Sequence, residues 1–205
     1  AHCIILSPDE RFAFVADLGI DRINSYRRES ESATLTPSVQ RDIYTHAGAG
    51  PRHLVFHSSG KHLYCINELD NSIGVYDYDS ISGAMIERQT ISTLPEGHSG
   101  ESHAGDLKIS PDARFLYATN RGHDSIAIYR IGTDGLLTSE KITPSLGKSP
   151  ISLAITSCGN FMICANSADD SLTVFHIDSE TGALFNASEP IKVICPSCVL
   201  ICERG

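Results

Sequence analysis

The chain is 205 residues long, with 41% hydrophobic and 20% charged residues and a formal net charge of −9. These values are typical of a globular protein and exclude an intrinsically disordered chain. The acidic balance argues against nonspecific binding to nucleic acid or to a membrane surface. Apolar runs stay well below the ~18–20 residues of a membrane-spanning helix, so we expect neither nucleic acid nor membrane as a partner.

The seven cysteines predict a reducing environment. Most of them lie in apolar runs such as Tyr64-Cys65-Ile66 and Ile163-Cys164-Ala165. Reduced cysteines that are buried as small hydrophobic residues show this pattern, which favours a cytoplasmic location. The run from Cys195 to Cys198, with Cys202, has a spacing seen in zinc sites and redox pairs, but the sequence offers no second pair of ligands. We therefore predict no metal and no cofactor.

An internal repeat organises the whole chain. Four segments align without gaps at offsets of 50, 53 and 46 residues: LSPDERFAFVADLGIDRINSY (6–26), FHSSGKHLYCINELDNSIGVY (56–76), ISPDARFLYATNRGHDSIAIY (109–129) and ITSCGNFMICANSADDSLTVF (155–175). Matched chemistry over 21 columns in four copies makes a chance similarity very improbable.

Each repeat predicts β-strands. In the second copy, apolar residues 54–56 precede a turn at 58–61, and a second apolar run covers 63–66. An alternating strand follows over 73–76, and a fourth strand follows a turn at 82–86. No segment has convincing helical periodicity. Four short antiparallel strands in ~45–50 residues are typical of a β-propeller blade.

We therefore predict an all-β protein, a β-propeller of four-stranded antiparallel blades, of which the chain supplies about four. The blades are expected, within a single domain 1–205, over 1–46, 47–99, 100–146 and 147–193, with 194–205 as a closing strand.

Two polar columns of the repeat are interpreted as turn residues, because Asx side chains hydrogen-bond nearby backbone and tolerate left-handed conformations. The first column ends the second strand of each blade and holds Asp17, Asn67, Asn120 and Asn166. The second lies in the following hairpin turn and holds Asp21, Asn71, Asp124 and Asp170.

Several motifs resemble the seven-bladed β-propeller lactonase family, which includes bacterial-type 6-phosphogluconolactonases and fungal carboxy-cis,cis-muconate cyclases. They are VADLGIDR (15–22), GAGPRHL (48–54), NEL (67–69), TLPEG (93–97), NRGHDSI (120–126) and PSCVL (196–200). The resemblance covers essentially the whole chain. It implies hydrolysis of a sugar lactone, specifically 6-phosphogluconolactone in the pentose phosphate pathway.

Two departures from the family pattern concern the N-terminus. The family ring has seven blades, of which this chain supplies about the last four. The family also carries a His-x-His pair at the entry to the first blade present, and this sequence opens inside that motif at Ala1-His2. Because the chain does not begin with Met either, we expect an incomplete seven-bladed ring.

The repeat columns themselves predict a site. His2 and Arg52 share the column at the start of the inner strand, and Glu68 and Arg121 share the column at the end of the next strand. An antiparallel hairpin places these two columns side by side, so the four residues should lie at one rim of the central channel. Deviation from the repeat at one rim is typical of a functional site placed on a scaffold.

The residue types suit an anionic lactone. Arg52 and Arg121 can bind a phosphate or carboxylate, and we assign His53 and His123 to substrate binding as further channel-lining candidates. Glu68 can act as a general base or orient a histidine that does, and His2 can protonate the leaving alkoxide. A structural ion pair between Arg52 and Glu68 is the plainer alternative.

Other functions stay open at this point. A lactonising reaction on a muconate-type acid could use the same rim, because its carboxylates would bind the same arginines. A noncatalytic propeller that binds a partner protein is the alternative from another class.

Overall fold

The computed structural model describes residues 1–29, 32, 34–38 and 42–202. These residues form β-strands in four antiparallel sheets, and their one helical element is the 3-10 turn η1 (Leu18–Ile20). The predicted all-β fold of four-stranded antiparallel blades is confirmed. The chain divides into two compact units, Ala1–Ser92 and Thr93–Gly205, and each unit contains two of the sheets.

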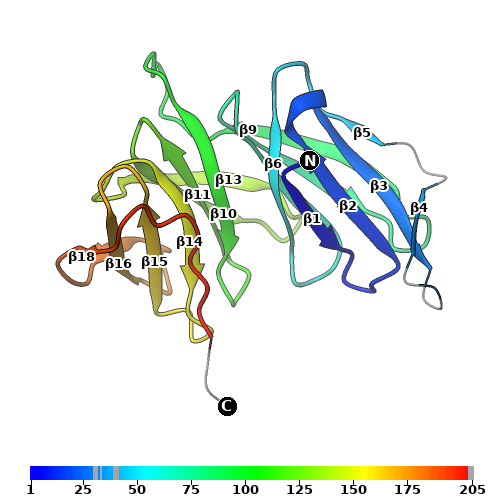
Figure 1. The fold of residues 1–205 in the computed structure, drawn as a ribbon. Helices are drawn as coiled ribbons and strands as arrows, with labels where there is room; N and C mark the ends of the chain where they lie inside the picture. The colour runs from blue at the N-terminus through cyan, green and yellow to red at the C-terminus, as the bar shows by residue number, and fades with distance from the viewer. Residues whose placement is uncertain (30–31, 33, 39–41, 203–205) are drawn as a thin grey trace. The chain divides into compact units, whose positions relative to one another are not determined.

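The first unit carries two sheets whose strands follow one another in sequence (Figure 1). The first sheet contains β1 (Cys3–Leu6), β2 (Phe12–Asp17), β3 (Arg22–Glu29) and β4 (Thr34–Pro37), with the short β5 (Ile43–Tyr44) also paired to β3. The second sheet contains β6 (Pro51–Phe56), β7 (His62–Asn67), β8 (Ser72–Tyr78) and β9 (Met85–Ser92).

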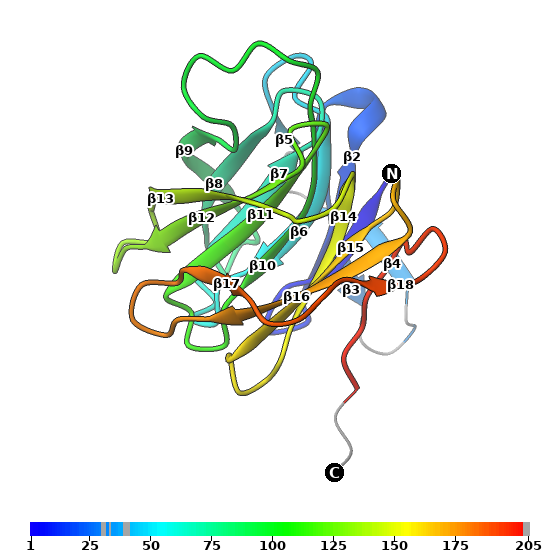
Figure 2. The same ribbon diagram turned by 90° about the vertical axis from the view of Figure 1, so that its left-hand side faces the viewer.

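The second unit repeats this arrangement. Its first sheet contains β10 (His103–Ile109), β11 (Phe115–Arg121), β12 (Ser125–Ile131) and β13 (Leu137–Pro144). Its second sheet contains β14 (Pro150–Ile155), β15 (Phe161–Asn166), β16 (Ser171–Ile177) and β17 (Leu184–Asn186), with β18 (Ile191–Lys192) also paired to β16. Figure 2 shows β17 and β18 following one another along β16.

The C-terminal segment differs from the sequence expectation. Residues 198–201, expected as part of a closing strand, have no strand assignment, and residues 203–205 of that expected strand lie outside the described part. The Val199 N–H donates to the Ser152 Oγ at 3.1 Å, a side-chain acceptor, so this contact starts no backbone ladder.

The two polar columns occupy equivalent positions in all four sheets, as predicted. The residues of the first column pair across the hairpin: Asp17 with Arg22, Asn67 with Ser72, Asn120 with Ser125 and Asn166 with Ser171. The residues of the second column all have left-handed backbones: Asp21 (φ 51), Asn71 (φ 55), Asp124 (φ 55) and Asp170 (φ 55). Both columns therefore serve the hairpin turn that Asx residues favour.

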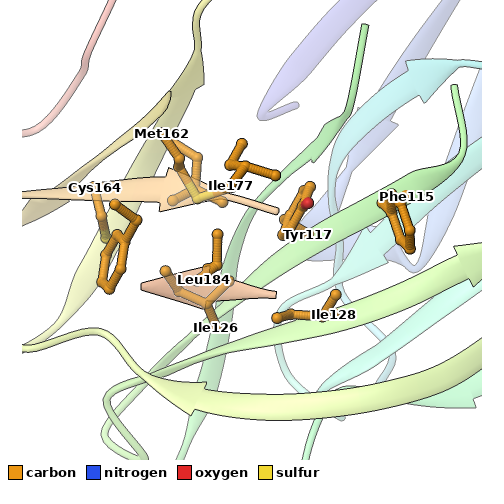
Figure 3. Close-up of a cluster of buried hydrophobic side chains, with 10 residues drawn as sticks. Phe115, Tyr117, Ile126, Ile128, Met162, Cys164, Ile177 and Leu184 are labelled. Carbon is orange, nitrogen blue, oxygen red and sulfur yellow. The ribbon is translucent and has the colours of Figure 1, made fainter. Parts of the chain in front are cut away.

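Each unit has its own hydrophobic core between its two sheets. In the first unit, the Tyr78 ring of β8 packs against Phe14 of β2 at 5.8 Å and Phe56 of β6 at 5.1 Å between centroids. In the second unit, Phe115 and Tyr117 of β11 pack with Met162 and Ile177 of the neighbouring sheet (Figure 3). Edge-to-face aromatic contacts and apolar burial hold the blades of a unit together.

Within the described residues, no helix has the length and apolar character needed to cross a membrane.

Candidate functional site

A β-bulge positions Arg52. In the β6–β7 pair, Pro51 lies opposite Asn67 and His53 lies opposite Ile66, so Arg52 is the extra residue between two ladder positions. A bulge redirects the side chain of its extra residue and is frequent beside functional sites. The innermost strands β10 and β14 have a register shift at the corresponding place.

The loop before β6 holds Glu68 next to the start of that strand. The Glu68 N–H donates to the Gly50 carbonyl at 2.7 Å. Gly50 has φ +67°, and a Cβ there would lie 2.6 Å from the Leu69 Cγ, so only glycine fits this close approach. The Asp21 carboxylate of the first blade accepts from the Gly48 and Gly50 N–H groups at 2.8 Å each. These hydrogen bonds lower the pKa of Asp21 and connect the loop to the first blade.

Arg52 and Glu68 form a partly buried ion pair, and they are close neighbours as the hairpin geometry predicts. The Arg52 Nε donates to the Glu68 Oε2 at 2.8 Å, and the two side chains are 7% and 19% exposed. Because the pair is partly buried, solvent screens its charges less than those of an exposed pair.

Two histidines complete the cluster in the first unit. The His53 Nε2 lies 3.3 Å from the Arg52 Nη1, and the His53 and His2 rings meet edge to face at 5.0 Å between centroids. The pKa of His2 is lowered, first by burial and then by the positive charge of Arg52. His2 is therefore neutral near pH 7 and able to accept a proton. We call His2, Arg52, His53 and Glu68 the inner-strand cluster.

The other two predicted site residues belong to the second unit. Arg121 ends β11, and its Nη2 donates to the Ala104 carbonyl at 3.2 Å. The His123 Nδ1 lies 2.7 Å from the Ser125 Oγ, and its ring meets the His98 ring at 4.8 Å. Burial, and then His98, lower the pKa of His123. That Arg121 and His123 share a rim with the inner-strand cluster stays a prediction.

Sequence reasoning missed a buried carboxylate in the second unit. Asp106 is 1% exposed; it accepts from the Leu107 N–H and the Leu153 N–H at 2.9 Å each and pairs with the Lys108 Nζ at 2.9 Å. The bond to Leu153 connects β10 to β14, so Asp106 fastens one blade to the next. The same repeat column holds His53 in the second blade and Ser152 in the fourth, so no residue type recurs there that could have pointed to Asp106.

The described residues contain no group of three or more His, Cys, Asp or Glu side chains arranged to hold a metal ion. The seven cysteines are free thiols, and the motif that resembled a zinc site is anchored through its backbone: the Cys195 N–H donates to the Asp170 Oδ1 at 2.8 Å.

The model of a family described as "Lactonase, 7-bladed beta-propeller" matches residues 1–201. Among curated proteins, a 6-phosphogluconolactonase of Pectobacterium carotovorum is 34% identical over 186 residues, which are 89% of this chain and 55% of that protein. A protein of Staphylococcus saprophyticus is 35% identical over 88% of this chain and 51% of its own length. The chain thus spans about half the length of these relatives.

Solved structures are similar over nearly the whole chain. The periplasmic gluconolactonase of Pseudomonas aeruginosa matches with a TM-score of 0.91 and 32% identity, covering 96% of this chain and 55% of that one.

Proposed function

Since this chain belongs to the seven-bladed β-propeller lactonase family, we propose that it acts in the hydrolysis of a sugar lactone, with 6-phosphogluconolactone as the substrate. The observation that carries the proposal is the inner-strand cluster, where the neutral imidazole of His2 lies near the partly buried pair of Arg52 and Glu68.

His2 is assigned the proton transfers. Its imidazole takes a proton from a water molecule as the water oxygen adds to the lactone carbonyl carbon. The ring C–O bond then breaks, and the imidazolium returns the proton to the leaving ring oxygen. The lowered pKa of His2 supports this role because the base must be neutral before the step begins.

Arg52 and Glu68 are assigned electrostatic roles. The buried guanidinium stabilises the negative charge that develops on the carbonyl oxygen in the tetrahedral intermediate. Glu68 favours the charged form of His2, so it stabilises the imidazolium that forms during water attack. The same carboxylate holds Arg52 through the 2.8 Å hydrogen bond to Nε.

The sequence predicts three further substrate-binding residues: Arg121, His53 and His123. For Arg121 and His123 we retain that assignment, with the phosphate of the substrate as the group that Arg121 binds. We also propose a cytoplasmic location and a role in the pentose phosphate pathway. The similar gluconolactonase of Pseudomonas aeruginosa is a periplasmic protein.

Lactone hydrolysis releases a proton, because the acid that forms is ionised near neutral pH. The test is a pH-stat assay of the purified chain with 6-phosphogluconolactone and with unphosphorylated gluconolactone, each corrected for spontaneous hydrolysis. We expect turnover of both and a higher kcat/KM for the phosphorylated substrate. No turnover above the spontaneous rate by the folded chain, or turnover of a carboxymuconate instead, contradicts the proposal.

The matched variants are Glu68→Gln and Glu87→Gln. Glu68→Gln should lower kcat by ~10²–10⁴-fold, because the charge that stabilises the imidazolium is lost while the shape is kept. Glu87 is an exposed residue of β9 outside the cluster, so its variant should keep the original rate. An unchanged rate in a folded Glu68→Gln variant would make Glu68 a purely structural residue.

A further inference from the structure

The His53 imidazole lies against the Arg52 guanidinium. Its Nε2 lies 3.3 Å from the Arg52 Nη1. A guanidinium carries only donors, so the Nε2 has to accept this hydrogen bond. An imidazole that makes this contact carries no proton on Nε2, because a doubly protonated imidazole has no acceptor.

Arg52 is held from two directions. Glu68 accepts from its Nε at 2.8 Å, and His53 accepts from its Nη1. Two acceptors on different nitrogens fix both the position and the plane of a rigid guanidinium. Arg52 is 5% exposed, so a donor that lost its partner there would carry a desolvation cost.

We propose that His53 is a positioning residue, which orients the Arg52 guanidinium as a neutral imidazole protonated on Nδ1 and does not itself bind substrate. This changes the role that the sequence alone assigns to it, because the Nε2 accepts from Arg52 and has no proton to donate to an anionic substrate. The expected effect of His53 on turnover rests on the proposed function, in which Arg52 stabilises the oxyanion. The contact between His53 and Arg52 is independent of that function.

The first test needs no substrate. In ¹⁵N-labelled protein near neutral pH, we expect the His53 Nε2 to show the chemical shift of an unprotonated nitrogen and the Nδ1 that of a protonated one, with His53→Gln used to assign the signals. The Arg52 Nε–H should exchange with solvent faster in His53→Leu than in the original chain. A protonated Nε2, or unchanged exchange in His53→Leu, overturns the proposal.

The second test separates positioning from substrate contact. Gln can place its Oε1 as many bonds from Cβ as the His Nε2, so His53→Gln keeps an acceptor for Arg52, whereas His53→Leu has none. We expect kcat to fall about tenfold in His53→Leu, as for a lost hydrogen bond to a charged group, and to recover in His53→Gln with little change in KM.

A double-mutant cycle with Arg52→Met completes the design. If His53 acts through Arg52, His53→Leu should have no further effect on kcat in the Arg52→Met background. The same loss in both backgrounds means that His53 contacts the substrate directly and overturns the proposal. If the original chain has no lactonase activity, the proposed function fails, and the NMR measurements still decide the role of His53.

Discussion

At the residue scale, the protonation of His2 depends on its neighbour Arg52. Burial lowers the pKa of His2 first, the positive charge of Arg52 lowers it further and His53 lowers it as well, while Glu68 raises it. A base with a lowered pKa stays neutral to a lower pH than an ordinary histidine. As the pH is lowered, kcat/KM should therefore start to fall only below about 6.5, the ordinary pKa of a histidine.

The Arg52→Met variant tests this dependence. Without the guanidinium, its repulsion of the imidazolium is lost and Glu68 loses the positive charge of Arg52. Both changes favour protonated His2. We expect an NMR titration to show a higher pKa of His2 than in the original chain. Arg52→Lys, which keeps a positive charge, should leave the pKa closer to its original value. An unchanged pKa in Arg52→Met contradicts the electrostatic coupling of the cluster.

At the element scale, each unit repeats one contact between its two blades. The Arg11 Nη1 donates to the Ser80 carbonyl at 3.0 Å in the first unit, and the Arg114 Nη1 donates to the Ser179 carbonyl at 3.1 Å in the second. The aromatic residue after each arginine packs on a glycine of the same loop. In the second unit this glycine is Gly182, where a Cβ would lie 2.5 Å from the Phe115 ring.

Gly182→Ala should therefore destabilise the second unit. The substitution combines a left-handed backbone, φ +71°, with a collision against a buried ring, so we expect a loss of roughly 2–4 kcal/mol in the free energy of unfolding. Gly97→Ala is the matched control, because Gly97 has φ +77° and open space around it. The control should lose only about 1 kcal/mol. If urea unfolding shows the same loss of unfolding free energy in both variants, the collision with the Phe115 ring contributes nothing to the effect of Gly182→Ala.

At the scale of the whole molecule, six of the seven cysteines are either exposed or buried, and Cys3 is intermediate. Four are exposed: Cys158, Cys195, Cys198 and Cys202. Cys65 and Cys164 are buried, and burial raises the pKa of both thiols, that of Cys164 to about 12. Because the thiolate is the reactive form, the two buried thiols are protected both by access and by protonation.

Labelling with a thiol reagent under native conditions should modify the four exposed cysteines rapidly. Cys65 and Cys164 should react only through unfolding, so urea should increase their labelling rate but not that of the exposed set. Mass spectrometry of the labelled peptides identifies each site. Rapid native labelling of Cys65 or Cys164 would contradict the packing of the two cores.

Four features could be predicted from the residues alone: the all-β fold, the blade repeat, the hairpin turns and the proximity of Arg52 to Glu68. These features depend on local rules: side-chain alternation, turn residues at regular offsets and the geometry of an antiparallel hairpin. Four other features became apparent only in the folded chain: the bulge at Arg52, the contact of His53 with its guanidinium, the blade-joining role of Asp106 and the absence of a strand over 198–201. These features depend on which position of the strand ladder is skipped and on which neighbouring strand supplies the hydrogen-bond partner. The spacing of residues along the chain predicts neither.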